Sequence, residues 1–308
     1  MDEFALIDAL HTRFGAAAVS DRMPIGIGDD SSVNRLPVGH ELVSSIDTLV
    51  AGTHFPADAA GREVGYRAMM VSLSDLAAMG ADPLFVLLAL ILPEDRSDWA
   101  LEFASGAAEA ALATGTLIAG GNLARGPLSA SISVHGSLPV GTAVRRSTAK
   151  PGDTVYVSGH LGGASAALRS GLQDQALLKD QALNERYWRP RARLDLSSVL
   201  RRDATSAIDI SDGLVQDLGH ILRASGLACD LNSASIPVFP GATLEDALYG
   251  GDDYELCFTM RSAPGASSGP VLLPGWPGPV YPIGTLKAGS GITIDGKPPS
   301  RTGYRHFV

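Results

Sequence analysis

A turn signal near the middle of the chain constrains the fold more than any other feature of the sequence. Residues 149–159 read AKPGDTVYVSG, in which KPGD is a turn signal and DTVYVS has the β-branched residues of a strand. A glycine-rich turn and a helix of small residues, GGASAALRSG, follow directly. A new structural unit therefore begins here, and 308 residues are too many for one compact core. We expect two domains, residues 1–148 and 149–308.

The first half of the chain mixes helices with strands. LSASISVH at 128–135 alternates polar and apolar residues without a fault, which is typical of a half-buried strand. The apolar run at 84–92 is either a buried strand or a buried helical turn, because periodicity does not separate the two. The other elements expected here are a strand at 41–48, a helix at 63–79 ended by Gly80, and a helix at 99–114.

The second half shows the same mixture. In the segment 211–226 the residues Leu214, Leu218, Ile221 and Leu222 form one apolar stripe, which predicts a helix with Ser211 as N-cap and Gly226 as its end. We also expect a charged helix at 172–188, a loop at 261–280 and a hairpin turn at Asp295-Gly296. No internal repeat with a fixed period is evident. The sequence therefore predicts a two-domain α+β protein.

Charge and composition exclude several classes of function. A formal charge of −9 argues against nucleic acid as a partner, because phosphate backbones call for a basic face. The longest apolar run, residues 84–92, is far shorter than the roughly 20 residues that span a bilayer. The acidic start MDEFALIDALHTRF does not resemble a signal peptide, and Cys229 and Cys257 have neither zinc-site nor disulfide spacing. We expect a cytoplasmic protein without membrane or nucleic-acid partners. An acidic protein can still bind small phosphorylated ligands if divalent cations bridge the charges.

Acidic residues recur beside glycines or at the ends of apolar segments. They are Asp29, Asp30, Asp47, Asp75, Asp209, Asp212, Asp252 and Asp253. Asp75 is the most informative, because it interrupts the apolar helix MMVSLSDLAAM, where a carboxylate is costly unless it is paired or bound to metal. Taken singly, each has an ordinary interpretation, such as a helix cap for Asp212 or a turn for Asp30. Together they favour a cluster of hard oxygen ligands, which suits Mg²⁺.

Phosphate-binding loops are less evident. GITIDGKP at 291–298 imitates a Walker A loop but ends in Pro where Ser or Thr is required, so we reject it. GHLGGASAAL at 159–168 either offers helix N-terminal amides to an anion or makes a tight turn, and the turn is the more favoured interpretation. LIAGGNLARGP at 117–127 is a better phosphate-site candidate. The pair Arg145-Arg146 is either a phosphate contact or an exposed basic pair.

Histidines give little support for hydrolytic chemistry. The sequence contains no HExxH and no GxSxG, and no nucleophile–base pairing is evident. His54 follows closely after Asp47 and is therefore a candidate for ligand contact, although an isolated histidine is more often structural.

Seven motifs in a fixed order resemble those of the thiamine-monophosphate kinase family. They are GIGDD, SSIDTLVAGTHF, VSLSDLAAMGADP, GGNLARGPLS, RRSTAKPGD, IDISDGL and GGDDYEL, and the similarity extends to about Tyr304. This family belongs to the superfamily of aminoimidazole ribonucleotide synthetase and selenophosphate synthetase. The resemblance implies an N-terminal α/β domain whose sheet forms a homodimer, followed by an α/β C-terminal domain. It also implies a transferase of thiamine biosynthesis, which uses ATP and several Mg²⁺ ions to convert thiamine monophosphate to thiamine diphosphate by in-line transfer without a general base.

The resemblance also assigns site residues. It implies metal ligation by Asp30, Ser45, Ile46 through its backbone, Asp47, Asp75, Asn122, Asp209 and Asp212. The ATP contacts implied are Gly121, Asn122, Arg146 and Ser211, and the substrate contacts are His54, Asp252 and Tyr304. The N-terminal domain is thereby expected to bind metal and ATP and to dimerise, and the C-terminal domain to complete the active site.

Three positions depart from the family pattern, which has Thr at Ile46, Asp at Asn122 and Glu at Asp252. Asn122 bears on one metal site, and Asp252 is one methylene shorter toward the substrate. Two alternatives follow. One is a related ATP-dependent kinase or synthetase with another acceptor, against which the pair SSIDTLVAGTHF and GGDDYEL speaks. The other is a non-catalytic nucleotide or thiamine-phosphate binding protein, which Asn122 favours.

Overall fold

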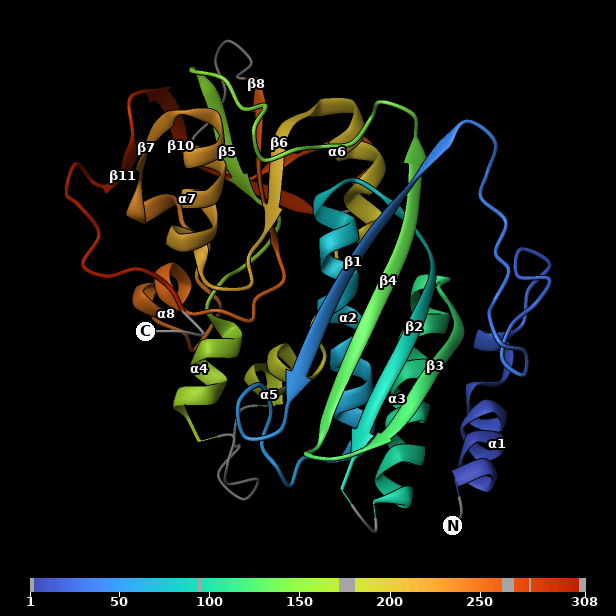
Figure 1. Ribbon diagram of the computed structural model, residues 1–308. Coiled ribbons are helices and arrows are strands. Elements are labelled where there is room, and N and C mark those ends of the chain that lie inside the picture. The colour runs from blue at the N-terminus through green and yellow to red at the C-terminus, as the bar shows by residue number, and fades with distance from the viewer. Residues whose placement is uncertain (1–2, 94–95, 172–180, 262–268, 277, 305–308) are drawn as a thin grey trace. The chain divides into compact units, whose positions relative to one another are not determined.

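The chain folds into two compact units, each built on its own sheet (Figure 1). The computed structural model describes residues 3–93, 96–171, 181–261, 269–276 and 278–304. Unit 1 comprises residues 1–76 and 81–141, and unit 2 comprises residues 77–80 and 142–308. No helix among the described residues is both long enough and apolar enough to cross a membrane.

Unit 1 is a four-stranded sheet with helices on one face (Figure 1). Its strands are β1 (His40–Val50), β2 (Asp82–Leu92), β3 (Leu117–Arg125) and β4 (Ser129–Pro139), in the order β1-β4-β2-β3. β1 and β2 pair antiparallel with β4, whereas β2 and β3 are parallel and are joined by a helix crossover. The helices are α1 (Glu3–Phe14), followed by the 3₁₀ turn η1 (Gly15–Ala18), α2 (Gly61–Ala78) and α3 (Ser97–Thr114).

Alternation gives the sheet of unit 1 two different faces. Along β4, Ala130, Ile132 and Val134 are buried, whereas the intervening side chains are only half-buried. The other face includes Ile46, which is 64 % exposed, and Leu87, which is 37 % exposed. The second sheet face of unit 1 taken by itself is therefore accessible and mixed, with apolar side chains such as Ile46 and Leu87 beside the serines and His135 of β4.

Glycines let α2 and α3 approach one another closely. A Cβ atom built on Gly65 would lie 2.0 Å from the carbonyl oxygen of Phe103, and one on Gly106 would lie 1.9 Å from that of Arg62. The two helix backbones are thus in direct contact, which no larger residue allows. Since α2 carries Asp75, this packing also sets the position of that carboxylate.

Unit 2 is a seven-stranded sheet that is mostly antiparallel. Its path is β11 (Gly291–Ile294), β7 (Leu227–Leu231), β10 (Pro279–Ala288), β5 (Asp153–Val157), β8 (Leu256–Arg261) and β6 (Ala204–Asp209), and β9 (Val271–Leu272) pairs with β10. Both faces are covered, because Val155 packs with residues of α7 (Leu214–Ser225), whereas Tyr156 packs with residues of α6 (Ser197–Asp203). β5 is accordingly buried at every position.

Short helices complete unit 2. They are α4 (Gly163–Arg169), α5 (Gln181–Trp188), η2 (Leu194–Leu196), η3 (Ser233–Ser235) and α8 (Leu244–Tyr249). A capping box formed by Thr243 and Asp246 begins α8. Tyr249, the last residue of α8, leads into the GGDDYEL motif.

The predicted fold class is confirmed, and most of the predicted elements are present. The ambiguous run at 84–92 is strand β2. The rejection of a Walker A loop is confirmed, since Asp295 and Gly296 both have positive φ in a tight turn after β11. The predicted loop at 261–280 contains the short strand β9, and the predicted helix at 172–188 is observed as α5, with residues 172–180 outside the described part.

One predicted helix cap is wrong. α7 begins at Leu214 with Gly213 as its N-cap residue, so Ser211 lies before the helix and does not cap it. The backbone N–H groups of Asp212 and Gly213 instead donate to Asp217 Oδ2, at 3.0 and 3.1 Å. The Asp217 carboxyl group in the first turn of α7 thus satisfies two N–H groups that precede the helix and have no partner within it. The predicted end at Gly226 is confirmed by its left-handed conformation.

Candidate active site

Three of the predicted metal ligands lie together in unit 1. Ser45 and Asp47 stand on β1 and Asp75 on α2, and the Ser45 hydroxyl donates to Asp75 Oδ2 at 2.5 Å. Burial, followed by the charge of Asp75, raises the pKa of Asp47 to about 6. A carboxylate whose proton affinity is raised by burial and by a neighbouring carboxylate is one whose charge a divalent cation would stabilise.

The strand alternation explains why Ile46 differs from its neighbours. Ser45 and Asp47 point to the face of β1 on the helix side, whereas Ile46 is 64 % exposed on the other. Its side chain therefore takes no part in this cluster. Only the backbone of Ile46 remains available to a ligand, as the sequence analysis assumed.

Asp30 lies in the loop before β1 and is exposed. Its backbone N–H donates to Asp29 Oδ1 at 2.8 Å, and Gly28, two positions earlier, has a φ of +114°. Within the ranges the structure describes, no three His, Cys, Asp or Glu side chains are gathered so as to hold a metal ion. A metal ion bound by these carboxylates would therefore need further oxygen ligands.

Gly121 and Asn122 lie on β3 beside an apolar pocket. Both residues are exposed, and they pair with Leu88 and Ala89 of β2. A Cβ atom on Gly121 would lie 2.0 Å from the Leu88 carbonyl oxygen, so strand packing alone requires glycine there. The pocket has a volume of about 180 Å³, and its lining comprises Glu3, Ile7, Leu10, His11, Phe14, Ile27, Leu88, Leu90, Phe103, Gly120, Gly121, Asn122 and Leu123. It offers an apolar cavity next to two of the predicted ATP residues.

His54 lies in the turn that follows β1. Its Nδ1 accepts the backbone N–H of Val50 at 3.0 Å, and its own backbone N–H donates to the Val50 carbonyl at 2.9 Å. The first bond requires the tautomer with hydrogen on Nε2 and fixes the direction of the ring. The His54 ring is thus held in a defined orientation.

A second acidic group lies in unit 2, at the end of β6. Asp209 is 5 % exposed, and Asp212 follows in the turn before α7. Asp217 on α7 is 2 % exposed, and burial together with the charge of Asp209 raises its pKa to about 8. Asp217 was not predicted as a site residue, although its place one turn into the apolar stripe of α7 is a usable signal.

The turn 210–213 also holds the predicted substrate residues of unit 2. The backbone N–H of Asp252 donates to the Ser211 carbonyl at 2.9 Å, and that of Tyr304 donates to the Asp212 carbonyl at 3.0 Å. Gln216 Nε2 donates both to Asp212 Oδ2, at 3.0 Å, and to the Tyr304 carbonyl, at 2.6 Å. Ser211, Asp212, Asp252 and Tyr304 therefore occupy one place in the fold, although 93 positions separate the first from the last.

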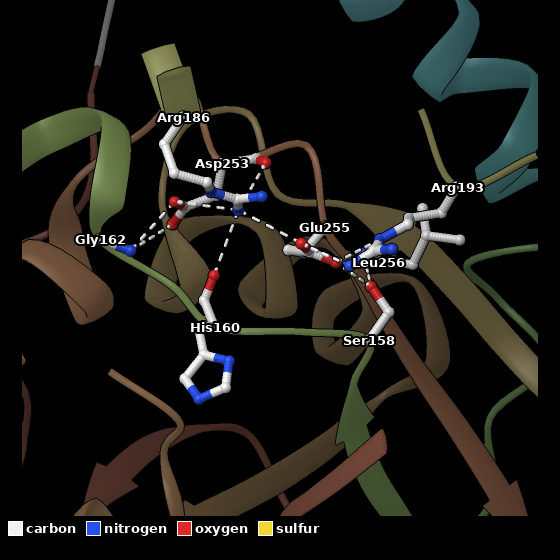
Figure 2. A network of polar contacts seen from close by, with 8 residues as sticks. All are labelled: Ser158, His160, Gly162, Arg186, Arg193, Asp253, Glu255 and Leu256. Atoms are coloured by element: carbon white, nitrogen blue, oxygen red, sulfur yellow. Dashed lines mark hydrogen bonds and ion pairs between the residues drawn. The ribbon is translucent and has the colours of Figure 1, made fainter. Parts of the chain in front are cut away.

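The side chain of Asp252 is hydrogen-bonded, and its backbone has an unusual conformation. Tyr254 donates its hydroxyl to Asp252 Oδ1 at 3.0 Å, and both residues have positive φ, 68° for Asp252 and 51° for Tyr254. Asp253 and Glu255 alternate with them and are each 1 % exposed (Figure 2). Both oxygens of Asp253 accept the backbone N–H of Gly162, at 2.9 and 2.8 Å. The amide at the turn before α4 is thus already bonded to a carboxyl group of the protein itself, and burial raises the pKa of that group to about 8.

Arg146 lies on the surface of unit 2. Its carbonyl accepts the hydroxyl of Ser225 at 2.9 Å, and its side chain is exposed. Burial lowers the pKa of His220, with smaller contributions from Arg223 and Arg146 in the same direction and an opposing one from Asp212. Arg146 and Asp212 are therefore both near enough to His220 to act on its titration.

The comparisons with known proteins agree over the whole chain. Residues 28–138 match the family described as AIR synthase related protein, N-terminal domain, and residues 150–297 match the corresponding C-terminal domain. Thiamine-monophosphate kinase from Salmonella typhimurium is 38 % identical over 99 % of this chain and 98 % of its own, and that from Escherichia coli strain K12 is 37 % identical over the same shares.

Solved structures lead to the same proteins. The crystal structure of thiamine-monophosphate kinase from Stenotrophomonas maltophilia superposes with a TM-score of 0.84 and 36 % identity, covering 97 % of this chain and 98 % of that one. A structure of AaThiL complexed with AMPPCP and TMP superposes with a TM-score of 0.76 and 30 % identity, covering 99 % and 97 % of the two chains.

Proposed function

Because this chain belongs to the thiamine-monophosphate kinase family, we propose that it transfers the γ-phosphoryl group of ATP to thiamine monophosphate, giving thiamine diphosphate and ADP. The observation that carries the proposal is the full-length match to these enzymes, including one bound to AMPPCP and TMP. The meeting of Ser211, Asp212, Asp252 and Tyr304 in unit 2 supports it, since four separately predicted residues lie in one place.

The acidic groups suit magnesium. In unit 1 we assign Asp30, Ser45, Asp47, Asp75 and Asn122, with the backbone of Ile46, and in unit 2 we assign Asp209 and Asp212. All of them offer hard oxygen donors, and the raised pKa of Asp47 fits a carboxylate placed for a cation. When bound, Mg²⁺ would neutralise phosphate charge and align the two phosphates. The incomplete coordination shell fits a metal that shares its ligands with substrate.

ATP contacts are assigned to Gly121, Asn122, Arg146 and Ser211. The apolar pocket beside Gly121 and Asn122 is lined by Leu88, Leu90 and Phe103, and it suits the flat, largely apolar base of a nucleotide. Arg146 carries a guanidinium that matches phosphate oxygens at two points.

Substrate contacts are assigned to His54, Asp252 and Tyr304. His54 presents a ring whose orientation its bond with Val50 fixes. Asp252 offers an acceptor held by Tyr254, and Tyr304 offers an aromatic ring that is 47 % exposed. A carboxylate and an aromatic face are suitable partners for a cationic heterocycle such as the thiazolium of thiamine.

In this reaction the proposed site residues position the two phosphates and do not transfer protons. The attacking phosphate oxygen is already ionised near neutral pH, so no general base is required. The obstacle is repulsion between two polyanions, since each pair of unit charges about 4 Å apart costs about 4 kcal/mol at an effective dielectric constant of 20. Residues that hold cations and orient both phosphates therefore supply the catalysis.

Two broader features complete the proposal. We expect a homodimer formed through the accessible sheet face of unit 1, because that face is apolar where Ile46 and Leu87 lie. We also expect the protein to act in the cytoplasm, where ATP and reduced cysteines occur. Both described cysteines, Cys229 and Cys257, are buried free thiols.

A coupled assay of ADP release tests the function. With thiamine monophosphate, ATP and Mg²⁺ we expect turnover, and with Mg²⁺ removed by chelation we expect none. Turnover only with another phosphorylated acceptor would support the related-kinase alternative. Binding of ATP and thiamine monophosphate without ADP release at any Mg²⁺ concentration would support the non-catalytic alternative, which Asn122 favours.

A further inference from the structure

A buried cluster of acidic and basic side chains, shown in Figure 2, includes Asp253, the residue that follows Asp252 in the chain. Asp253 and Glu255 supply its two carboxylates, and Arg186 and Arg193 its two guanidinium groups. The arginines come from α5 and from the segment before η2, more than 55 positions away from the carboxylates in the sequence. The proposed function uses none of these four residues.

Glu255 is saturated with donors. Arg193 Nε donates to Glu255 Oε2 at 2.6 Å and Arg193 Nη2 donates to Oε1 at 2.8 Å, which is a two-point fork. The hydroxyl of Ser158 donates to Oε2 at 2.6 Å and accepts the backbone N–H of Leu256 at 2.8 Å. Burial alone would raise the pKa of Glu255, but Arg193 and Arg186 hold it below its ordinary value. Glu255 is therefore a fixed anion between β5 and β8.

Arg186 ties the turn after β5 to the same segment. Its Nη2 approaches Glu255 Oε1 at 3.2 Å, the His160 carbonyl at 3.2 Å and the Asp253 carbonyl at 3.4 Å. It also lies 4.0 Å from Asp253 Oδ1, while Gly162 donates to both oxygens of that carboxylate. Figure 2 shows the two arginines reaching the carboxylates from different sides.

The backbone of the segment needs this support. Asp252 and Tyr254 both adopt a left-handed conformation, which is unfavourable for residues with a side chain and persists only where the surroundings fix it. Asp252 and Tyr254 each stand next to a buried carboxyl group, that of Asp253 or Glu255, which is anchored by hydrogen bonds. The two buried residues therefore determine the direction in which Asp252 and Tyr254 point. A buried ion pair adds little net stability compared with apolar packing, so stability alone does not explain the cluster.

We infer that Arg186 and Arg193 are positioning residues for Asp252, acting through Asp253 and Glu255 without touching the reactants. This inference rests on the proposed function, because it takes Asp252 as a contact of thiamine monophosphate. It adds two arginines that set the acceptor side of the site. Losing the fork of Arg193 should weaken the use of thiamine monophosphate more than the use of ATP.

The test exchanges arginine for lysine at two neighbouring positions. Arg193→Lys keeps the charge but loses the fork, whereas the matched control Arg191→Lys changes an exposed arginine that pairs with Asp195 at 3.1 Å. For Arg193→Lys we expect KM for thiamine monophosphate to rise about tenfold, with KM for ATP and kcat within about twofold of the wild type. Arg191→Lys should match the wild type in all three constants.

Two further measurements separate positioning from general destabilisation. Leu286→Ala removes core packing from β10 in the same unit without touching the cluster. It should lower Tm but leave unchanged the KM ratio, which is KM for thiamine monophosphate divided by KM for ATP. Amide hydrogen exchange of residues 252–255 should quicken in Arg193→Lys and not in Arg191→Lys. If Arg193→Lys does not fold, Glu255→Gln replaces it, since it keeps the shape of Glu255 and removes its charge.

The possible results are distinct. A wild type that releases no ADP with thiamine monophosphate overturns the proposed function and this inference together. If the wild type is active and Arg193→Lys has the same KM ratio as the wild type, the inference alone is overturned. The same holds for Glu255→Gln where that variant is used. Equal KM changes in Arg193→Lys and Leu286→Ala would also overturn it, because they would show a general effect of lost stability.

Discussion

At the scale of single residues, Asp47, which we propose as a metal ligand, shows how packing raises the pKa of a carboxyl group. Burial and the neighbouring Asp75 raise its pKa from 3.8 to about 6. Between pH 4 and pH 6, Asp47 is mostly ionised in the unfolded chain but mostly protonated in the folded, metal-free protein. Asp47 therefore destabilises the metal-free protein progressively as the pH rises from about 4 to about 6.

The Asp47→Asn variant tests this reasoning. In the presence of a chelator, its free energy of unfolding relative to the wild type should increase from pH 4 to pH 6, by up to about 3 kcal/mol, and stay constant above. Urea unfolding at half-unit pH steps measures the difference. The same variant should have almost no turnover at saturating Mg²⁺, because it replaces a charged metal ligand. A difference independent of pH would show that Asp47 titrates normally.

The proposed metal contact of Asn122 can be tested by the Mg²⁺ dependence of activity. An amide oxygen coordinates Mg²⁺ but brings no charge, so the wild type should need more Mg²⁺ than an Asn122→Asp variant. The measurement is activity against free Mg²⁺ at saturating ATP for both forms. Superimposable curves would mean that position 122 does not contact metal. A silent wild type rescued by Asp would favour the non-catalytic alternative.

At the scale of elements, the contact between α2 and α3 fixes how closely the helix that carries Asp75 approaches its neighbour. The backbones touch at Gly65 and Gly106, where a Cβ atom would fall about 2 Å from a carbonyl oxygen. The helices must therefore separate if either glycine gains a side chain. Such separation would also move the α2 face that carries Asp75.

We expect Gly106→Ala to lower the free energy of unfolding by about 3 kcal/mol, the upper part of the usual range for overpacking. Gly219→Ala in α7 is the matched control, because the nearest atom to its Cβ is the movable end of Arg223, at 3.2 Å. The control should be neutral or stabilising, since alanine favours helix over glycine. Equilibrium unfolding in urea compares them, and a harmless Gly106→Ala would refute the tight contact.

The same elements show how far the sequence could predict the structure. The alternation of 128–135 identified β4 correctly, because one face of that strand is buried and the other is not. The run at 84–92 stayed ambiguous because apolar residues such as Leu87 also occupy its accessible face. The Ser211 cap failed because Asp217, within the helix, takes the N–H groups that a cap would take.

The candidate site was predictable where a motif carries its own chemistry and not where partners are distant in sequence. Asp47 and Asp75 were identified from their local setting and do lie together. The roles of Asp253 and Glu255 could not be read from GGDDYEL, because Arg186 and Arg193 lie in another segment whose approach only the fold reveals. Which acidic residues of this motif contact the arginines therefore depends on the tertiary structure.

At the scale of the whole molecule, the accessible sheet face of unit 1 predicts self-association. Sedimentation at micromolar concentration should give about twice the monomer mass of 31.9 kDa. Leu87→Arg, which places a charge on that face, should produce monomers, because an unpaired charge is costly in an apolar interface. Leu112→Arg on α3 is the control, since Leu112 is 60 % exposed away from that sheet. A wild-type monomer at every concentration would refute the homodimer.

The left-handed backbone at Asp252 has a consequence for how this sequence diverged from its relatives. The resemblance implies glutamate at this position, yet aspartate tolerates a positive φ better, because its short side chain bonds locally. The exchange of Glu for Asp thus gives up one methylene of reach and eases the chain at the same residue. In the proposed site, the shorter reach toward substrate would therefore come together with less backbone strain. The reverse step toward glutamate would meet the backbone as its first obstacle.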